Sequence, residues 1–213
     1  MPADRLSPLQ RDIVRALAEQ RSGFFLTGGG VLAGWILGHR PTDDLDLFST
    51  DDAAIADADS LAHALAHAVG ANLEALQTMP DHRRYLFSRG SEATRVDFVR
   101  DRGVQLYEKA QRDGVPTDSV EEIMANKITT LASGSEIRDI VDLYYLEKAG
   151  YRIEDSLDDA LTKDGGATPA TIAWLLSTLR VPGELPGDVS RDEIVSYVRE
   201  LEVRFRAAAR PGD

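Results

Sequence analysis

The segment from residue 27 to residue 48, TGGGVLAGWILGHRPTDDLDLF, decides the fold of this chain. It follows the apolar run GFFL (23–26), which predicts a short buried strand that runs into a glycine turn. Residues 31–38 are apolar and long enough for two turns of buried helix. Residues 44–49, DLDLFS, then alternate acidic and apolar side chains, which is the period of a strand. Strand, turn, helix and strand therefore follow one another closely.

The acidic residues of the second strand stand where leucine would suit a buried strand better. Residues two apart in a strand point to the same face, so Asp44 and Asp46 project together. Two like charges side by side are unfavourable unless a cation lies between them. A third carboxylate, Asp97, has a similar setting in TRVDFV (94–99). These three residues are the candidate ligands of one or two magnesium ions, with manganese as the alternative ion, because hard cations prefer oxygen ligands.

The glycines at 28–30 stand between a predicted strand and a predicted helix. Backbone N–H groups at such a helix N-terminus form a favourable site for phosphate. The spacing of the glycines matches neither the P-loop nor the dinucleotide-binding motif. The alternative interpretation is a plain tight turn followed by acids with solvated side chains.

The pattern of the chain changes at about residue 118. Before it, we predict helices and strands in this order: helices at 7–20 and 51–70, then strands at 72–78, 83–89 and 94–100. After it, we predict only helices, at 118–133, 136–149, 155–163, 168–179 and 190–208. The expected architecture is an α/β (α+β) domain with a small mixed sheet flanked by helices (1–115), followed by a helical domain (116–213).

The composition limits the classes of protein. A formal charge of −12 over 213 residues argues against a protein that coats nucleic acid, because phosphate backbones attract basic surfaces. The absence of cysteine excludes disulfides, thiolate metal sites and a cysteine nucleophile. There is no apolar run of about 18 residues and no basic-then-apolar leader, so we expect a soluble cytoplasmic protein with no membrane segment.

Three segments together resemble the AbiEii/AbiGii toxin family of nucleotidyltransferases: LTGGGVLAGWILGHRPTDDLDLF (26–48), RVDFV (95–99) and NKITTLASGSEIRDIVDLYYL (126–146). This family belongs to the superfamily with a DNA polymerase β-like nucleotidyltransferase fold. The resemblance implies transfer of a nucleotide from a nucleoside triphosphate (NTP) to an acceptor, which for some members is the 3′ end of tRNA. It also implies a partner antitoxin.

The resemblance assigns roles to individual residues of this chain. The nucleotide phosphates would be bound by Gly28, Gly29, Thr42 and Lys127. The metal ligands would be Asp44, Asp46 and Asp97, with Asp97 also the candidate general base. The remaining catalytic residues would be Lys127 and Asp139, the acid of the last motif.

The helical half contains charged residues in apolar surroundings. Lys127 interrupts the apolar stripe of the helix predicted at 118–133. Its ammonium group either reaches solvent or points at an anion in a cleft, and the resemblance favours a triphosphate. The next helix is apolar on two sides, so Asp139 and Asp142 are not expected to be solvated. The alternative to a site role is structural, an ion pair with Arg138, Lys127 or a helix N-terminus.

Three arginines offer a local basic patch for RNA near Asp97. Arg83, Arg84 and Arg95 lie on the strands predicted at 83–89 and 94–100. The alternative is that they form the exposed side of an edge strand.

We therefore predict a magnesium-dependent nucleotidyltransferase that uses an NTP, with the helical domain completing the active-site cleft. Two alternatives stay open. A nucleotidyltransferase that modifies a small molecule or a protein is favoured by the acidity of the chain, which would attract cationic acceptors. A catalytically decayed binding protein of the same fold is favoured by Gly134, which stands where the family pattern often has an arginine, seven residues after Lys127.

Overall fold

Seven strands form one mixed sheet in the order β3-β4-β5-β2-β1-β7-β6 among the residues that the computed structural model describes, 4–20, 22–134 and 136–209. The strands are β1 (Phe25–Thr27), β2 (Asp44–Ser49), β3 (Asn72–Met79), β4 (His82–Arg89), β5 (Glu92–Arg100), β6 (Ala110–Arg112) and β7 (Val115–Thr117). Strand β2 lies centrally, antiparallel to β1 and parallel to β5. The expected mixed sheet is confirmed.

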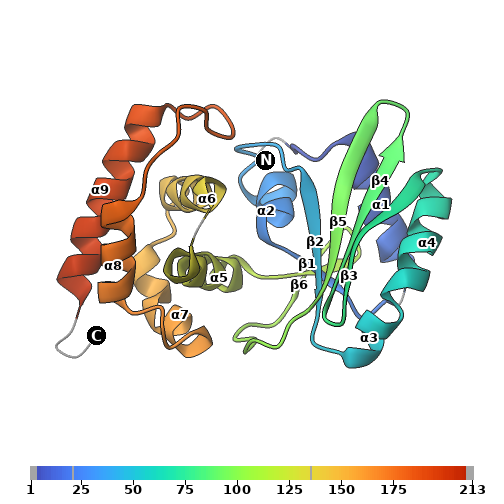
Figure 1. Cartoon of the computed structure of the whole chain (residues 1–213), viewed down its shortest axis with the longest axis horizontal. Coiled ribbons are helices and arrows are strands. Elements are labelled where there is room, and N and C mark those ends of the chain that lie inside the picture. The colour runs from blue at the N-terminus through green and yellow to red at the C-terminus, as the bar shows by residue number, and fades with distance from the viewer. Residues whose placement is uncertain (1–3, 21, 135, 210–213) are drawn as a thin grey trace. The chain divides into compact units, whose positions relative to one another are not determined.

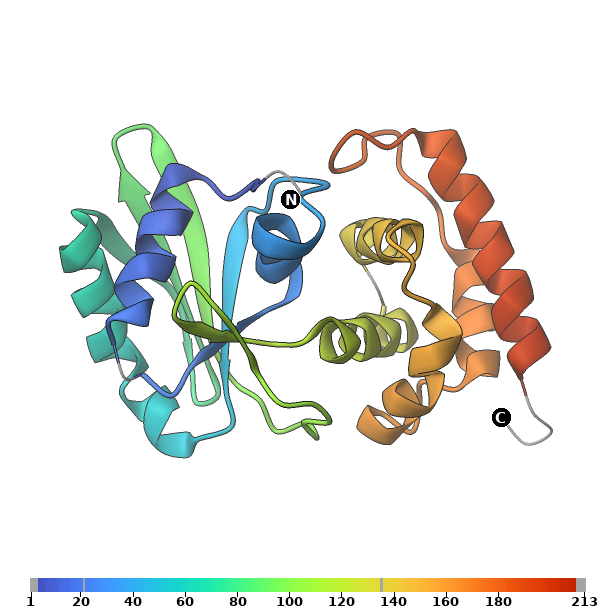
Figure 2. The same ribbon diagram turned by 180° about the vertical axis from the view of Figure 1, so that it is seen from behind.

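The helices α1 (Pro8–Ala18), α3 (Asp52–Ala56) and α4 (Ala58–Val69) accompany this sheet. Figure 2 shows α1 lying over the strands, and Figure 1 shows α4 beside β3 and β4. Polar contacts from both helices reach the same sheet face: Gln10 of α1 donates to the Thr94 hydroxyl at 3.0 Å, and Tyr85 donates to Asp59 of α4. The strand residues on that face are fully buried and apolar, among them Leu45, Leu47, Val96, Phe87 and Phe98. The hydrophobic core of the sheet therefore lies on this side, which leaves the other face for polar side chains.

The start of the first helix shows how closely local sequence predicts local structure. Ser7 accepts the N–H of Gln10, and the Gln10 side chain bonds back to the Ser7 N–H, which is a capping box. Pro8 occupies the first helical position, where its missing N–H costs nothing.

The chain divides into two compact units. Unit 1 comprises Met1–Gly103 and Glu108–Ser119, and unit 2 comprises Val104–Tyr107 and Val120–Asp213. The short segment 104–107 belongs to unit 2 because the buried carboxylate of Glu122 accepts the N–H groups of Leu106 and Tyr107, at 3.0 and 2.9 Å.

Unit 2 is helical, as expected. Its helices are α5 (Val120–Ser133), α6 (Ile137–Lys148), the 3₁₀ helix η2 (Ile153–Ser156), α7 (Leu157–Lys163), α8 (Pro169–Thr178) and α9 (Arg191–Ala208). They bury apolar side chains against one another, among them Ile128, Leu131, Ile140, Leu146, Ile172, Leu201 and Phe205. No helix within the described ranges is long and apolar enough to cross a membrane.

Two local expectations are wrong. The alanine-rich stretch 51–70 forms two helices, α3 and α4, because Asp57 ends the first and begins the second. Aspartate competes with helical hydrogen bonds and favours helix ends. The segment 110–117, which carried no predicted element, forms the hairpin β6–β7. Its turn residues Asp113 and Gly114 both have positive φ, 49° and 81°. Two-residue hairpin turns require this conformation and favour Asp-Gly, so the sequence did contain a signal for the hairpin.

Candidate active site

The three acids singled out from the sequence share one face of the sheet. Asp46 of β2 is the direct register partner of Asp97 of β5, and Asp44 is the partner of Arg95. Alternate residues of a strand point to the same side, so Asp44, Asp46 and Asp97 project opposite to the buried leucines of β2. Asp44 and Asp97 are buried, and Asp46 is half-buried. Two central parallel strands thus bring the carboxylates together.

The glycine turn lies directly against Asp46. Gly28 has φ +63°, and a Cβ atom built on it would lie 2.9 Å from the Asp46 Oδ2 atom. Glycine is required there, both by the left-handed conformation and by the close approach. Helix α2 (Gly28–Val31) begins at this turn and continues as a π-helical turn, η1 (Leu32–Ile36). The first N–H groups of α2 therefore lie next to a carboxylate of the candidate site.

Thr42 and Arg40 form the other side of this turn. A Cβ atom on Gly29 would lie 2.9 Å from the Arg40 Nη2 atom and 3.4 Å from the Thr42 hydroxyl. The Thr42 hydroxyl donates to Asp44, with its oxygen 3.2 Å from Oδ1. The structure therefore assembles the glycines, Thr42 and two acids in one place within unit 1.

Asp97 has strong partners of its own. Arg84 of β4 binds it through two hydrogen bonds, Nε to Oδ1 at 2.7 Å and Nη2 to Oδ2 at 3.1 Å. His82 Nε2 lies 2.6 Å from Oδ1. The hydrogen bond to Asp97 raises the pKa of Arg84 above its usual value, and the charges of Asp44 and Asp46 act in the same direction. We call Asp97, Arg84 and His82 the sheet cluster.

The predicted basic patch is divided between the two faces of the sheet. Arg84 is the register partner of Asp97, and Arg95 lies 3.7 Å from Asp44, so both accompany the acids. Arg83 is opposite Phe98 and points to the helix-covered face, where it lies 3.6 Å from Asp59. The edge-strand alternative is wrong for all three, because β4 and β5 are interior strands.

The donor set fits a hard divalent cation, since all three candidate ligands are carboxylates. Within the ranges that the structure describes, no three His, Asp or Glu side chains are already arranged around a common metal position. Asp97 instead faces Arg84 and His82. A ligand role, or a role as general base, therefore requires Asp97 to exchange these bonds.

The charged residues of the helical half form a second cluster, in unit 2. The Lys127 ammonium of α5 lies 2.5 Å from Asp139 Oδ1 and 2.9 Å from Asp142 Oδ2, both on α6. Asp139 also accepts the N–H of Glu136 through Oδ2 at 3.3 Å and so caps α6. Lys127 is buried, with only 11% of its side chain exposed, so it does not extend along the surface to solvent. We call Lys127, Asp139 and Asp142 the helix cluster.

The electrostatics of the helix cluster keep its lysine charged. Burial by itself would lower the pKa of Lys127, but Asp142 and Asp139 outweigh burial and raise this pKa above its usual value. The ion-pair alternative that the sequence left open is what the structure contains.

Gly134 follows the same helix α5. It has φ +99°, and a Cβ atom built on it meets nothing within 4 Å. Glycine suits this position, because any side chain here would be strained by the backbone conformation.

Sequence reasoning missed a buried carboxylate next to the acids. Asp118 accepts the Thr27 hydroxyl at 2.5 Å and the Lys109 ammonium at 2.5 Å, and Thr27 is the register partner of Asp46. Lys109 also lies 3.8 Å from the centre of the Phe25 ring. No motif signalled this chain of contacts, because its members are joined only by the pairing of β1 with β7.

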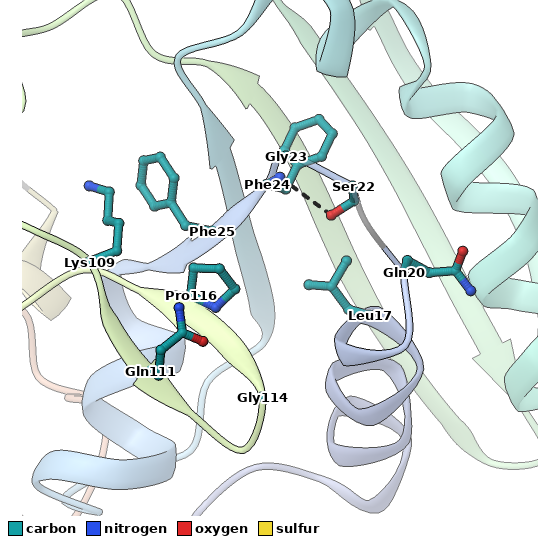
Figure 3. Close-up of a pocket in the computed structure, with 10 residues that line it drawn as sticks. All are labelled: Leu17, Gln20, Ser22, Gly23, Phe24, Phe25, Lys109, Gln111, Gly114 and Pro116. Carbon is teal, nitrogen blue, oxygen red and sulfur yellow. Dashed lines mark hydrogen bonds between the residues drawn. The ribbon is translucent and has the colours of Figure 1, made fainter.

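Unit 1 also contains a cavity of about 360 Å³ between the end of α1 and the β6–β7 hairpin (Figure 3). Leu17, Phe25, Gln111 and Pro116 line it, and none of the site residues expected from the sequence does. It is therefore separate from the carboxylates.

Comparison with known proteins decides the family. A family model described as nucleotidyl transferase AbiEii toxin, type IV toxin–antitoxin system, matches residues 11–196. This chain belongs to the AbiEii family. No curated protein matches the sequence.

Two solved structures resemble this AbiEii-family chain in fold. The crystal structure of JHP933 from Helicobacter pylori has 18% sequence identity and a TM-score of 0.63, covering 93% of this chain and 89% of that one. MenT4, a nucleotidyltransferase toxin from Mycobacterium tuberculosis H37Rv, has 16% identity and a TM-score of 0.60, covering 93% and 85%. The expected nucleotidyltransferase fold is confirmed. Membership in the AbiEii family supports transferase activity, a toxin role and an antitoxin partner.

Proposed function

We propose that this AbiEii-family chain transfers a nucleotide from an NTP to the 3′ end of a tRNA, with a divalent metal ion, as the toxin of a toxin–antitoxin pair. The observation that carries the proposal is the meeting of Asp44, Asp46 and Asp97 on one sheet face, next to the Gly28 turn. Carboxylates beside the N–H groups at the start of a helix suit a metal-bound triphosphate.

Asp44 and Asp46 would hold the metal ion, joined by Asp97, and magnesium or manganese fits these oxygen donors. When bound, the ion neutralises triphosphate charge and activates an attacking hydroxyl. The N–H groups of Gly28 and Gly29 would receive phosphate oxygens at the start of α2. Thr42, whose hydroxyl donates to Asp44, would keep that carboxylate oriented.

We further propose that Lys127 contacts the triphosphate and that Asp139 is the acid that supports it. A lysine has three N–H donors, and the bonds to Asp139 and Asp142 use two of them. The third would bind a phosphate oxygen, and the ion pairs would orient the ammonium group rather than prevent its function.

The first experiment is calorimetric titration of the four NTPs, with and without Mg²⁺, into the wild type and Asp46→Asn. We expect magnesium-dependent binding of at least one NTP, weakened by about 100-fold in Asp46→Asn because a ligand charge is lost. Asp43→Asn is the matched control, since Asp43 is the exposed neighbour that precedes β2. Binding that is insensitive to Asp46 would contradict the proposal.

The acceptor is tested by incubating the protein with α-labelled NTPs and total tRNA, followed by the mass of the labelled product. Addition of nucleotides at the tRNA 3′ end is expected. The formal charge of −12 favours a cationic small molecule or protein as the competing acceptor. If the label is found only in such a product and its incorporation still requires Asp46, the acceptor is not tRNA, but the protein is still a nucleotidyltransferase.

A further inference from the structure

Arg84 occupies the carboxylate that the proposed function needs. Its guanidinium group covers both oxygens of Asp97, at 2.7 and 3.1 Å, in the fork geometry that makes arginine–carboxylate bonds strong. The Asp97 side chain is only 4% exposed, and His82 engages Oδ1 as well. Asp97 therefore has little room for a further ligand while Arg84 stays in place.

The two partners differ in their freedom to move. Asp97 is fixed on an interior strand, whereas the Arg84 side chain is 38% exposed and retains access to water. An exchange at this carboxylate would therefore move Arg84 and leave Asp97 in position. Arginine remains charged throughout, so a displaced Arg84 needs another anion nearby.

The surroundings of Arg84 supply such an anion once a nucleotide binds. Arg84, Asp97 and Asp46 are successive register partners across β4, β5 and β2, and neighbouring strands lie about 4.8 Å apart. Asp46 adjoins the Gly28 turn, where the phosphates are proposed to bind. The Cα atoms of Arg84 and Asp46 are therefore about 10 Å apart, so the guanidinium group can approach a phosphate that lies between the two residues, and its fork matches a phosphate as well as a carboxylate.

We propose that Arg84 is an exchangeable counter-ion of this site. It neutralises Asp97 while no metal is bound, and it binds a phosphate of the nucleotide when Asp97 ligates a divalent cation. The inference rests on the proposed function and adds a residue that links metal binding to nucleotide binding. Its consequence is that removal of Arg84 affects the two ligands in opposite directions.

The competition between Arg84 and a metal ion is tested with Mn²⁺ alone. Electron paramagnetic resonance measures the concentration of free Mn²⁺ in the presence of the full chain. We expect Arg84→Gln to bind Mn²⁺ about tenfold more tightly than the wild type, because the competing charge-assisted bonds are gone. Arg84→Lys keeps the charge but not the fork, and should also bind Mn²⁺ more tightly, by a smaller factor. Arg83→Gln is the matched control on the same strand and the opposite face, and should leave Mn²⁺ affinity unchanged.

The binding of a nucleotide phosphate by Arg84 is tested by titrating the NTP identified above into the same variants at saturating Mg²⁺. Arg84→Gln should bind it about tenfold more weakly, Arg84→Lys should recover part of the loss, and Arg83→Gln should match the wild type. Thermal unfolding of each variant without ligands verifies that it is folded.

Each result counts for or against the exchange. Weaker or equal Mn²⁺ binding in Arg84→Gln overturns it, and so does the absence of Mn²⁺ binding in both proteins. Tighter Mn²⁺ binding together with undiminished NTP affinity also overturns it, because Arg84 would then block the metal without serving the phosphate. If no NTP binds to the wild type, the proposed function fails, and with it the phosphate role of Arg84; the Mn²⁺ titration still shows whether Arg84 competes with a metal ion.

Discussion

The sheet cluster and the helix cluster are built from the same chemistry in different surroundings. Each joins one basic side chain to aspartate, with Arg84 on Asp97 in the first and Lys127 on Asp139 and Asp142 in the second. The Arg84 side chain is 38% exposed, whereas that of Lys127 is 11% exposed and faces a carboxylate with no exposure at all. Arg84 can therefore exchange Asp97 for water or a ligand, whereas Lys127 cannot leave its two carboxylates in the same way.

This difference shows how burial changes the role of an ion pair. In a pair whose cation is partly exposed, water can replace the cation's bonds, so the cation can leave its carboxylate and serve a ligand. A buried pair holds the helices in register, because a charge that loses its partner there has no water to replace it. The residue types alone do not distinguish the two cases.

The largest expected effect is on stability in the helix cluster. Lys127→Met should lower the free energy of unfolding by about 3–5 kcal/mol, since it leaves Asp139 and the fully buried Asp142 without their cation. The matched change in the sheet cluster, Arg84→Met, should cost less, about 1–2 kcal/mol, because water can reach the position of Arg84 and His82 still lies 2.6 Å from the buried Asp97 carboxylate. Urea unfolding followed by circular dichroism measures both. Equal losses in the two variants would break the comparison.

A smaller effect is expected from two glycines, Gly28 against Asp46 and Gly134 after α5. Gly28→Ala and Gly134→Ala both force a side chain into positive φ, at +63° and +99°. Only the first also places Cβ 2.9 Å from Asp46 Oδ2, whereas nothing lies within 4 Å at Gly134. We expect losses of about 2 and about 1 kcal/mol in the free energy of unfolding.

These glycine variants should also separate binding from stability. NTP affinity, measured by calorimetry, should fall tenfold or more in Gly28→Ala, because a moved Asp46 weakens the metal site. It should be unchanged in Gly134→Ala. If Gly134→Ala instead bound the NTP more weakly than Gly28→Ala, the Gly28 turn would not be part of the nucleotide site.

The smallest effect concerns pH. The pKa of Lys127 is raised in the folded state, so its contribution to stability is complete below the unfolded pKa, about 10.4, and is lost only as pH rises through the higher folded value. The difference in free energy of unfolding between the wild type and Lys127→Met should therefore stay constant from about pH 7 to 9. A decline of this difference within that range would mean that burial outweighs the two carboxylates.

Much of the fold follows from patterns within short segments. The first helix, the acidic strand DLDLFS and the helices of the second half lie where the sequence predicts them. These features depend on contacts a few residues apart, which a linear pattern records. The break at Asp57 and the hairpin at Asp113–Gly114 were missed, although the Asp-Gly signal of the second was present.

The candidate site was predictable to the extent that it depends on strand periodicity. A period of two places Asp44 and Asp46 on one face, and the similar setting of Asp97 in TRVDFV indicated the third acid. The partners of these acids were not predictable in the same way. Arg84 and Arg83 are adjacent in the chain, and only the register of β4 against β5 sends one to Asp97 and the other to Asp59.

The sequence by itself determined the order of the elements, the glycine turn before the acidic strand, and the family to which the chain belongs. The tertiary structure alone decided which polar and charged side chains meet and how much water reaches them: Thr27 with Asp118, Arg84 with Asp97, and Lys127 with Asp139 and Asp142. The physical reason is that secondary structure depends on neighbours along the chain. The strength and exchangeability of a charge pair depend instead on distance and burial, which arise only when distant strands and helices pack together.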